Sequence, residues 1–399
     1  MYGLLSHTSK SSVKRKRTKM KRPRVLHLIN KLGSGSGPLD RSLQLNYEDF
    51  EIIICSYYDS QQDLASLTLK TDKELIGLGA TSRVDFKSWA RLYRIIRDKK
   101  IDIIHSYHHL MGILGRVVGK CASTPIVVHN IGNMYNKFSL LARLFNDVTF
   151  VLVDSIICVS KSVEQSFTLW ENMLLNGKKI IIYNGTNVSE IDDCATRLEK
   201  KREQLNIKQD DFVIGNIARL IPQKDQKTLI RAFSEVVKSE PKVKLIIVGG
   251  GRLENTLKKL VRDLDLEDTV IFTGLIERAE VYKILHILDL FVMTSLWEGF
   301  CVAVLQAMAA RKPVILTDIP PFREAIDDGI CGKLVPVRDP KAIAEAILEF
   351  KNNPEMAKRV GEAGRKRVIE NFLIQKTVEN YQKLYDKLLR GKNIKNCRG

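Results

Sequence analysis

Apolar runs of strand length alternate with segments of helical periodicity from Arg24 to about Ile347, and this alternation constrains the fold more than any other feature. A strand buried on both faces of a parallel sheet is apolar throughout, and a helix must connect it to its parallel neighbour. The runs are RVLHLIN, FEIIICS, KELIGL, IDIIHSY, PIVVHNI, SIICVS and KIIIYNG in the first half, and FVIGNIA, KLIIVGG, VIFTGL, LFVMTS, PVILTD and KLVPV in the second. The sequence therefore predicts an α/β fold with parallel sheets covered by helices on both faces.

A polar, charge-mixed stretch over residues 186–211 has no strand pattern and separates the two sets of runs. A chain of 399 residues is longer than a typical single domain, so two domains are expected. We predict a basic flexible tail over 1–23, one Rossmann-like domain over 24–190, a second over 211–372 and a closing helix over 373–390. Two doubly wound domains face each other across a cleft, where ligands bind at the carboxyl ends of the strands.

Positive charge is concentrated at the N-terminus. Nine of the 64 Lys and Arg, and none of the 46 Asp and Glu, lie in the first 24 residues, so this tail carries half of the net charge of +18. Such a tail is usually a solvated arm, although it suits an anionic membrane surface or nucleic acid equally well. The seven cysteines include no C-x-x-C pair and indicate reduced thiols in the cytoplasm. No apolar run is long enough to span a bilayer, so any membrane contact is expected to be peripheral.

A glycine-rich loop, KLGSGSGPLDRSL, directly follows the first predicted strand. Gly33 and Gly35 fit the dinucleotide fingerprint G-x-G-x-x-G, but its third position falls on Pro38. The most specific sign of a dinucleotide-dependent oxidoreductase is therefore missing. Glycines here still let backbone N–H groups approach an anion at a helix start, so the loop is either a phosphate contact or a tight turn without a ligand.

Two cations, Arg219 and Lys224, bracket a turn after the first strand of the second half, in IARLIPQKDQ. They suit a diphosphate, because the guanidinium offers forked donors and the ammonium a point charge. A Lys near a helix start opposes the helix dipole and so hints at an external anion, but an ordinary surface pair fits the spacing equally well. Three glycines after the next strand, at 249–251, provide either room for a ligand or a plain turn.

The strongest chemical pattern is WEGFCVAVLQAMAARKPVI, from Trp297 to Ile315. Glu298 lies in a loop, and residues 299–301 are expected to begin a helix whose free N–H groups suit a diphosphate. Glu298 would accept hydrogen bonds from hydroxyls on one side of that group, and Gln306 from hydroxyls on the other. Hydroxyl-rich groups on both sides of a diphosphate describe a nucleotide sugar, although a solvated loop acid and a polar helix position also fit the spacing.

The segments ARLIPQKD, IIVGGG, IFTGL, TSLWEGFCVAVLQAMAARKPVI and GKLVPVRDPKAIAEAI resemble, in order and spacing, the retaining glycosyltransferases of family four, which have the GT-B fold. The first half is similar more loosely, in VLHLINKLGSGSGP, IDIIHSYHHLMGILGR, VVHNIGN, ICVSKSV and IIYNGTN. The resemblance covers about residues 24–390. It implies that Arg219 and Lys224 hold the donor diphosphate, that Glu298 contacts the transferred sugar, and that the closing helix packs back on the first domain.

The donor-binding residues implied by the resemblance are Gly35, Gly37, Arg219, Lys224, Gly249, Gly250, Thr273, Gly274, Glu298, Gly299, Phe300, Cys301, Val302 and Gln306. One of them departs from the family. Gln306 stands where the family's E-x(7)-E signature has its second acid, which contacts the nucleotide ribose. A carboxamide still accepts from a ribose hydroxyl but lacks the charge-assisted component of that bond.

The catalytic residues implied by the resemblance are His129, Glu298, Arg219 and Lys224. His129 aligns with the histidine that approaches the transferred sugar from the acceptor domain. No metal and no cofactor other than the nucleotide-sugar co-substrate is expected, because the one D-x-D, Asp263–Asp265, lies in a helical surface pattern. Histidines at 105, 108 and 109 show no carboxylate or cysteine partner in the sequence, so we expect structural or acceptor-side roles for them.

These observations predict a retaining glycosyltransferase that moves a sugar from a nucleoside-diphosphate sugar to a hydroxyl of a glycan or lipid-linked glycan precursor, in polysaccharide biosynthesis. The alternatives are a sugar-nucleotide epimerase or hydrolase of the same fold, or a non-catalytic protein with a degenerate site that binds nucleic acid through its basic arm. A specific nucleic-acid partner is not expected.

Residues 136–145, NKFSLLARLF, suit peripheral contact with an anionic membrane at its inner face. A core helix with two snorkelling cations is commoner, however, and is expected here.

Overall fold

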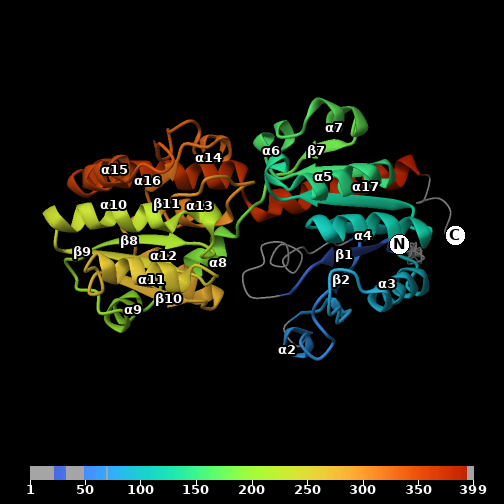
Figure 1. The fold of residues 1–399 in the computed structure, drawn as a ribbon, viewed down its shortest axis with the longest axis horizontal. Helices are drawn as coiled ribbons and strands as arrows, with labels where there is room; N and C mark the ends of the chain where they lie inside the picture. The colour runs from blue at the N-terminus through green and yellow to red at the C-terminus, as the bar shows by residue number, and fades with distance from the viewer. Residues whose placement is uncertain (1–21, 33–48, 69–70, 393–399) are drawn as a thin grey trace, which may run out of the picture.

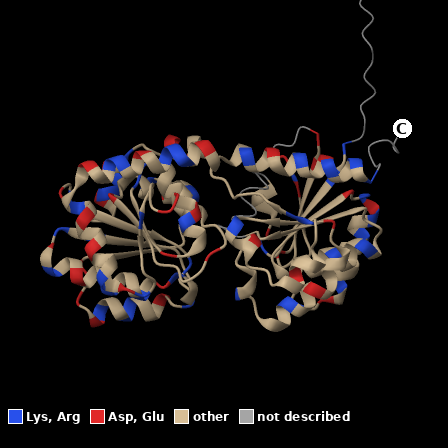
Figure 2. Ribbon diagram, turned by 90° about the horizontal axis from the view of Figure 1, so that it is seen from above, with Lys and Arg blue, Asp and Glu red and all other residues tan. Residues whose placement is uncertain are grey.

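The computed structural model describes residues 22–32, 49–68 and 71–392. These residues form two domains, each built on its own parallel sheet (Figure 1). Every apolar run predicted above to be a strand is one, so the predicted α/β fold of two doubly wound domains is confirmed. Charged residues of both signs are interspersed along the helices of both domains (Figure 2).

The N-terminal sheet has seven parallel strands in the order β3-β2-β1-β4-β5-β6-β7. Their bounds are β1 (Arg24–Ile29), β2 (Glu51–Ser56), β3 (Glu74–Gly77), β4 (Ile103–Tyr107), β5 (Ile126–Ile131), β6 (Ser155–Cys158) and β7 (Lys179–Ile181). The strand order reverses between β1 and β4. In open sheets of this kind, ligands bind beyond the carboxyl ends of the strands at such a reversal.

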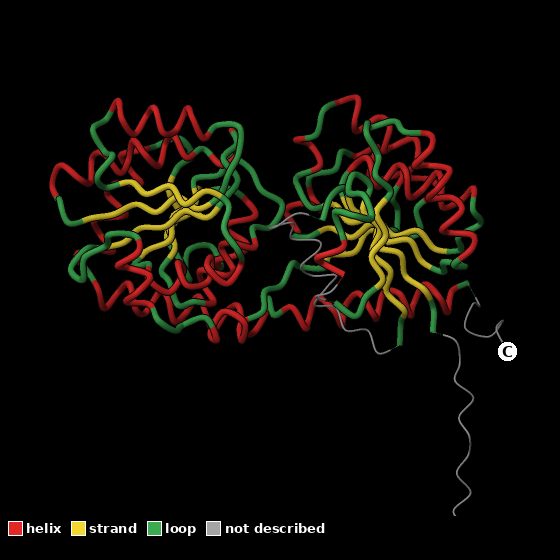
Figure 3. Tube along the Cα trace, turned by 90° about the horizontal axis from the view of Figure 1, so that it is seen from below, coloured by secondary structure: helices red, strands yellow, loops and turns green. Residues whose placement is uncertain are grey.

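The C-terminal sheet has six parallel strands in the order β10-β9-β8-β11-β12-β13. Their bounds are β8 (Phe212–Ile217), β9 (Val243–Val248), β10 (Val270–Gly274), β11 (Leu290–Met293), β12 (Val314–Thr317) and β13 (Lys333–Val335). Here the order reverses between β8 and β11. Figure 3 shows the strands of each domain enclosed by helices.

The helices of the N-terminal domain cover both faces of its sheet. They are α2 (Ala65–Thr68), α3 (Phe86–Asp98), α4 (His109–Cys121), α5 (Leu140–Thr149), α6 (Lys161–Gln165) and α7 (Leu169–Leu174), with 3-10 turns η1 (Tyr135–Lys137) and η2 (Phe150–Leu152). Leu92 of α3 and Met111 of α4 pack with Leu28 in one core cluster. The other face of the sheet is covered by the last helix of the chain.

The helices of the C-terminal domain are η3 (Pro222–Lys224), α10 (Gln226–Ser239), α11 (Glu254–Asp263), α12 (Arg278–Ile287), α13 (Val302–Ala309), α14 (Pro320–Ile326), α15 (Pro340–Asn352) and α16 (Pro354–Asn371). Rings from the two domains meet between them. Tyr183 lies 5.2 Å from Phe300 and 5.4 Å from Phe372, measured between ring centroids. These aromatic contacts hold the two domains against each other.

The stretch over 186–211 that was predicted to be a linker is folded. It contains α8 (Val188–Asp193) and α9 (Leu198–Gln204). His286 of α12 lies 2.8 Å from the Ile191 carbonyl, and Lys201 of α9 pairs with Glu280 of α12 at 2.6 Å. Both helices therefore belong with the C-terminal domain, which includes residues before 211. Their mixed charges face solvent, and this makes short surface helices resemble a loop in the sequence.

The last helix, α17 (Ile374–Gly391), leaves the C-terminal domain and packs on the N-terminal sheet. Tyr381 and Tyr385 are buried there beside Val128. The Asn130 amide donates to the Tyr381 hydroxyl at 3.0 Å, and His105 Nδ1 lies 2.5 Å from the Tyr385 hydroxyl. Within the part of the chain that the structure describes, no helix combines the length and apolar character needed to cross a bilayer.

Candidate active site

Loops at the carboxyl ends of β8, β9 and β10 lie side by side. The Gly249 N–H donates to the Gly274 carbonyl at 3.0 Å, and the Leu220 N–H donates to the Gly250 carbonyl at 3.0 Å. Only glycine fits at 249, because its φ is 129° and a Cβ would lie 2.1 Å from the Ala218 carbonyl oxygen. The structure thus brings together, at one edge of the sheet, the predicted residues Arg219, Gly249, Gly250, Thr273 and Gly274.

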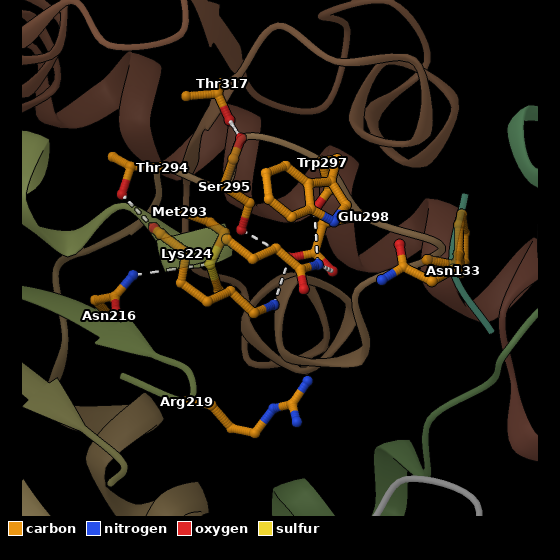
Figure 4. Close-up of polar contacts among 12 residues, drawn as sticks. Asn133, Asn216, Arg219, Lys224, Met293, Thr294, Ser295, Trp297, Glu298 and Thr317 are labelled. Carbon is orange, nitrogen blue, oxygen red and sulfur yellow. Dashed lines mark hydrogen bonds and ion pairs between the residues drawn. The ribbon is translucent and has the colours of Figure 1, made fainter. Parts of the chain in front are cut away.

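A buried ion pair lies next to these loops (Figure 4). Lys224, at the end of η3, points its ammonium at Glu298 and pairs with Oε1 of that carboxylate; the two residues are 8% and 7% exposed. The Ser295 hydroxyl donates to the same oxygen at 2.7 Å. The Gln223 amide donates to the Trp297 carbonyl at 2.7 Å and so holds the loop. Glu298 is therefore a fixed acceptor at the carboxyl end of β11.

The surroundings of Lys224 favour its charged form. Burial alone would lower the pKa of Lys224, but the neighbouring Glu298 carboxylate raises that pKa above its ordinary value. Burial also raises the pKa of Cys301, so its thiol stays protonated at neutral pH. Lys224 opposes the dipole at a helix start, as noted from the sequence. Its partner is Glu298, so an external anion is not required to explain its position.

Helix α13 begins at Val302, later than the predicted start at 299–301, and Cys301 is its N-cap without a side-chain capping bond. The N–H groups of the first turn of a helix have no intrahelical acceptor, and the helix dipole favours an anion there. This helix start lies directly beyond Glu298 in the chain. The predicted helix start is thus present but begins later in the chain, and its binding of an anion stays a prediction.

The backbones of the two domains lie in close contact at Gly299. A Cβ on this residue would lie 2.2 Å from the carbonyl oxygen of Gly132 in the N-terminal domain, so any side chain would push the domains apart. The Ser160 hydroxyl donates to the Gly299 carbonyl at 2.8 Å, and the Asn184 amide donates to the Phe300 carbonyl at 3.2 Å. Groups of the first domain therefore fix the loop that precedes α13.

A cavity of about 260 Å³ lies between the domains. Its lining includes His109, His129, Asn133 and Phe138 from the first domain and Arg219 from the second. Figure 4 shows the guanidinium of Arg219 apart from the Lys224–Glu298 pair. Within the described residues, this guanidinium makes no hydrogen bond or ion pair. The two domains thus face a cleft, as predicted, and a cation without a partner in the described part of the chain opens on it.

His129 on β5 is buried, and its position is made possible by Gly112 of α4. A Cβ at Gly112 would lie 2.4 Å from the imidazole carbon Cε1. Nδ1 of His129 lies 3.0 Å from the Ser106 hydroxyl and 3.2 Å from the Ser106 carbonyl. Burial, followed by the charges of Arg116 and His109, lowers the pKa of His129 well below its ordinary value. The imidazole is therefore neutral and lies beside the cavity.

Gln306 lies on α13 one turn beyond Val302, and both residues are partly exposed. Residues four apart lie on the same side of a helix, so Gln306 shares the face of the free helix start. Within the described ranges, its carboxamide has no hydrogen-bond partner. Contact between Gln306 and a ribose stays a prediction. Two other predicted donor contacts, Gly35 and Gly37, lie outside the described residues.

Buried neutral histidines make the stability of the fold depend on pH. Burial, with a smaller effect of Lys73, lowers the pKa of His27 to about 3, and the pKa of His129 is also lowered. The unfolded chain binds these protons near pH 6.5, so stability falls as the pH drops below that value. Between pH 7.5 and 5.5, each of the two histidines is expected to cost about 1.4 kcal/mol. Urea midpoints at the two pH values test this.

The variant His129→Asn is the control for that experiment, because it removes one titrating group. Its urea midpoint is expected to change less with pH than that of the unsubstituted protein. Equal pH dependence in both proteins would show that His129 does not titrate differently in the folded and unfolded states.

Several residues at the domain contact were missed from the sequence. Glu324 of α14 accepts from the Lys161 N–H at 2.8 Å and from the Tyr183 hydroxyl at 2.6 Å, so it joins the two domains. Contacts across more than a hundred residues leave no local pattern. Ser295 was missed as well, although its position three residues before Glu298, in the same loop, was a usable signal.

Two doubly wound domains that meet at such a cavity define the GT-B class of glycosyltransferases. The chain matches two family models, Glycosyltransferase Family 4 over residues 44–190 and Glycosyl transferases group 1 over residues 198–367. Together the models span most of the chain. It belongs to the family-four glycosyltransferases, as its motifs suggested, and the alternatives of an epimerase, a hydrolase or a non-catalytic protein receive no support.

Two curated relatives are similar over most of their length. One is the UDP-Gal:alpha-D-GlcNAc-diphosphoundecaprenol alpha-1,3-galactosyltransferase of Escherichia coli, 25% identical over 75% of this chain and 79% of the relative. Another is the capsular polysaccharide biosynthesis glycosyltransferase CapM of Staphylococcus aureus, 25% identical over 77% and 82%. Both are described as glycosyltransferases, which agrees with the family assignment.

Solved structures show the same fold. Anabaena Alr3699/HepE in complex with UDP and glucose superposes with a TM-score of 0.79 at 19% identity, covering 92% of this chain and 100% of that one. Sucrose-phosphate synthase from Thermosynechococcus elongatus gives a TM-score of 0.75 at 20% identity, covering 93% and 100%. The GT-B architecture predicted from the motifs is therefore confirmed.

Proposed function

We propose that this glycosyltransferase moves a sugar, with retention, from a nucleoside-diphosphate sugar to a hydroxyl of a glycan or of a lipid-linked glycan precursor. One observation carries the proposal: the guanidinium of Arg219, which has no partner among the described residues, opens on a cavity that is also lined by the neutral imidazole of His129. A cation on one domain and a neutral imidazole on the other suit an anionic leaving group and a hydroxyl of the transferred sugar.

The donor diphosphate would bind between Arg219 and the free N–H groups at the start of α13. Lys224 donates one of its three N–H bonds to Glu298, which leaves two for phosphate oxygens. Glu298 would accept from hydroxyls of the transferred sugar, and Gln306 from those of the ribose. The glycine loops at 249–250 and 273–274 would admit the nucleotide, since they offer little side-chain bulk.

The transfer breaks the bond between the anomeric carbon and a phosphate oxygen while the acceptor oxygen bonds to that carbon on the same face. The acceptor proton passes to the departing phosphate oxygen, so no side chain has to act as the base. Arg219, Lys224 and the helix N–H groups stabilise the negative charge that develops on the leaving group. The neutral imidazole of His129 would form a hydrogen bond with the transferred sugar and so orient it.

The acceptor class is suggested by the relatives. The Escherichia coli galactosyltransferase is named for a diphosphoundecaprenol-linked acceptor, and an alpha-monoglucosyldiacylglycerol synthase of Streptococcus pneumoniae is 26% identical over 67% of this chain. The first name describes a lipid-linked acceptor, and the second describes a glycolipid product. We propose an acceptor of this class, met by peripheral contact at the cytoplasmic face of a membrane.

Thermal unfolding with a panel of nucleoside-diphosphate sugars tests the donor site. A donor at about 100 times its Kd stabilises the folded protein by about 2.7 kcal/mol, which is expected to raise the Tm by several degrees. The matching nucleoside, which lacks the diphosphate, is expected to give a much smaller shift. A panel in which no member raises the Tm more than its nucleoside would contradict the proposal.

Product analysis with the radiolabelled donor then separates transfer from other reactions. Label is expected to move to a lipid-linked acceptor only when that acceptor is added. Rapid release of free sugar, or epimerised donor in the absence of an acceptor, would instead identify a hydrolase or an epimerase.

A further inference from the structure

Helix α5 presents its apolar side to the outside of the protein. Leu141, Phe145 and Val148 are 69%, 62% and 67% exposed. These residues lie three or four apart in the sequence and so form one side of the helix. The prediction that residues 136–145 form a core helix is therefore wrong. The spacing of the apolar residues correctly predicted a helix. However, the polar side of this helix faces the domain, and the apolar side faces outward.

The side of α5 that faces the domain is held by polar contacts. Asn146 accepts from the buried guanidinium of Arg116 at 2.6 Å, and Asp147 accepts from the Tyr135 hydroxyl at 2.8 Å. Arg143 donates to the buried carboxylate of Glu171 on α7 at 2.6 Å. These contacts determine the rotation of α5, because turning the apolar side inward would bury Leu and Phe side chains against charges and expose the network.

Exposed apolar side chains continue from α5 onto its neighbours. Both α5 and α7 lie on the upper part of the N-terminal domain in Figure 1. We call this surface the α5–α7 face, and its residues are Leu140, Leu141, Leu144, Phe145, Val148, Val151, Leu169, Trp170 and Met173, all between 56% and 86% exposed. These nine make up more than half of the large apolar residues exposed in the described part of the chain. Such a concentration on one face is typical of an interaction surface.

The charges next to the α5–α7 face are positive. Lys137 precedes α5 and Lys178 follows α7, and within the described ranges neither side chain has an ion-pair partner. Of the four acids in residues 131–180, Asp154, Glu164 and Glu171 pair with a cation, and Asp147 accepts from the Tyr135 hydroxyl on the side of α5 that faces the domain. A face with exposed apolar side chains, including a Trp, and with cations at its margins suits an anionic bilayer interface.

We propose that the α5–α7 face docks this enzyme on an anionic lipid bilayer, with the apolar side chains entering the headgroup region. The face also adjoins the interdomain cavity. Phe138, two residues before α5, lines the cavity, and its ring lies 3.6 Å from the ring of His109. An acceptor anchored in the docked bilayer would therefore meet the cavity at the start of α5. This last consequence rests on the proposed function, whereas docking itself does not.

Co-sedimentation of the full-length protein with vesicles tests the docking. The wild-type chain is expected to bind vesicles of phosphatidylglycerol and phosphatidylcholine more tightly than vesicles of phosphatidylcholine alone. The double variant Leu141→Gln/Phe145→Gln is expected to lower the partition coefficient at least tenfold, because both side chains lose their apolar contact with lipid. Both positions are exposed, so the fold should be unaffected.

Phe86→Gln is the matched control. Phe86 is 72% exposed and lies on α3, which α4 separates from α5, so its partition coefficient is expected to match that of the wild type. The donor is expected to raise the Tm equally in the wild type, the double variant and the Phe86→Gln variant. A loss of vesicle binding with an unchanged Tm shift then reports on docking alone, and not on the donor site. Equal vesicle binding by the double variant and the wild type would overturn the proposal. A wild-type dimer that the double variant breaks, without vesicle binding, would overturn it in favour of a subunit interface.

Discussion

Replacing Arg219 with alanine is expected to lower kcat/KM for sugar transfer by about 10²–10³, the usual cost of losing a preorganised group that stabilises developing charge. Arg219 is the cation of the second domain that opens on the interdomain cavity. Its guanidinium has no hydrogen-bond or ion-pair partner within the described residues, so its removal should leave the Tm almost unchanged. Initial rates with saturating acceptor, together with thermal unfolding, measure the two effects separately.

Arg219→Lys is the control for this experiment. It keeps the positive charge but loses the forked donors, so a smaller loss of about tenfold is expected. A wild-type kcat/KM in Arg219→Ala would show that the guanidinium does not contact the leaving group. An equal loss of kcat/KM in both variants would show that the forked donors of the guanidinium are required and that its positive charge alone is not sufficient.

Replacing Lys224 with alanine is expected to affect both activity and stability. Removing one partner of a buried ion pair leaves the other charge uncompensated, at a cost of about 3–5 kcal/mol. Glu298 is 7% exposed and would retain only its neutral hydrogen bonds, from the Ser295 hydroxyl and the Gln223 amide. Activity is expected to fall by about 10³, because a phosphate contact is lost and Glu298 is displaced. Urea unfolding and steady-state rates measure the two effects.

The double variant Lys224→Met/Glu298→Gln separates the two roles of the pair. Removing both charges avoids an unpaired buried carboxylate, so most of the lost stability should return, while activity should stay low. Recovery of activity along with stability would show that Lys224 acts only in the fold. No recovery of stability would show that the volume or the hydrogen bonds of the pair matter more than its charge.

The fold could be predicted from the sequence because its strands are buried on both faces. Runs such as VLHLI in β1 and KLIIV in β9 must lie inside a covered parallel sheet. The stretch over 186–211, which separates the two sets of strands, could not be predicted in this way. Helices α8 and α9 are short and charged, and they are held by single contacts such as the one between Lys201 and Glu280. The local sequence of these helices does not reveal a partner that lies so far away in the chain.

The site could be predicted in part. Arg219, Lys224 and Glu298 were found because they follow strands β8 and β11, whose carboxyl ends must share one edge of the sheet. That Lys224 and Glu298 pair with each other could not be inferred, since they are 74 residues apart in the chain. The close approach of Gly299 to Gly132 depends on how the two domains dock, which periodicity does not encode.

The orientation of α5 shows a further limit of sequence patterns. Periodicity identifies an amphipathic helix and leaves open which side faces the domain. Here buried polar partners decide it: Arg116 and Tyr135 bind the polar side of α5, so the leucines face outward. Only the three-dimensional positions of those partners settle the orientation.

The central claim is that Arg219 and the start of α13 bind a diphosphate between the two domains. A crystal structure with the nucleoside diphosphate that gives the largest Tm shift tests it most directly. Phosphate oxygens are expected within hydrogen-bond distance, about 2.7–3.2 Å, of the Arg219 guanidinium and of an N–H in the first turn of α13. A diphosphate bound elsewhere, with Arg219 still unpaired, would contradict the account.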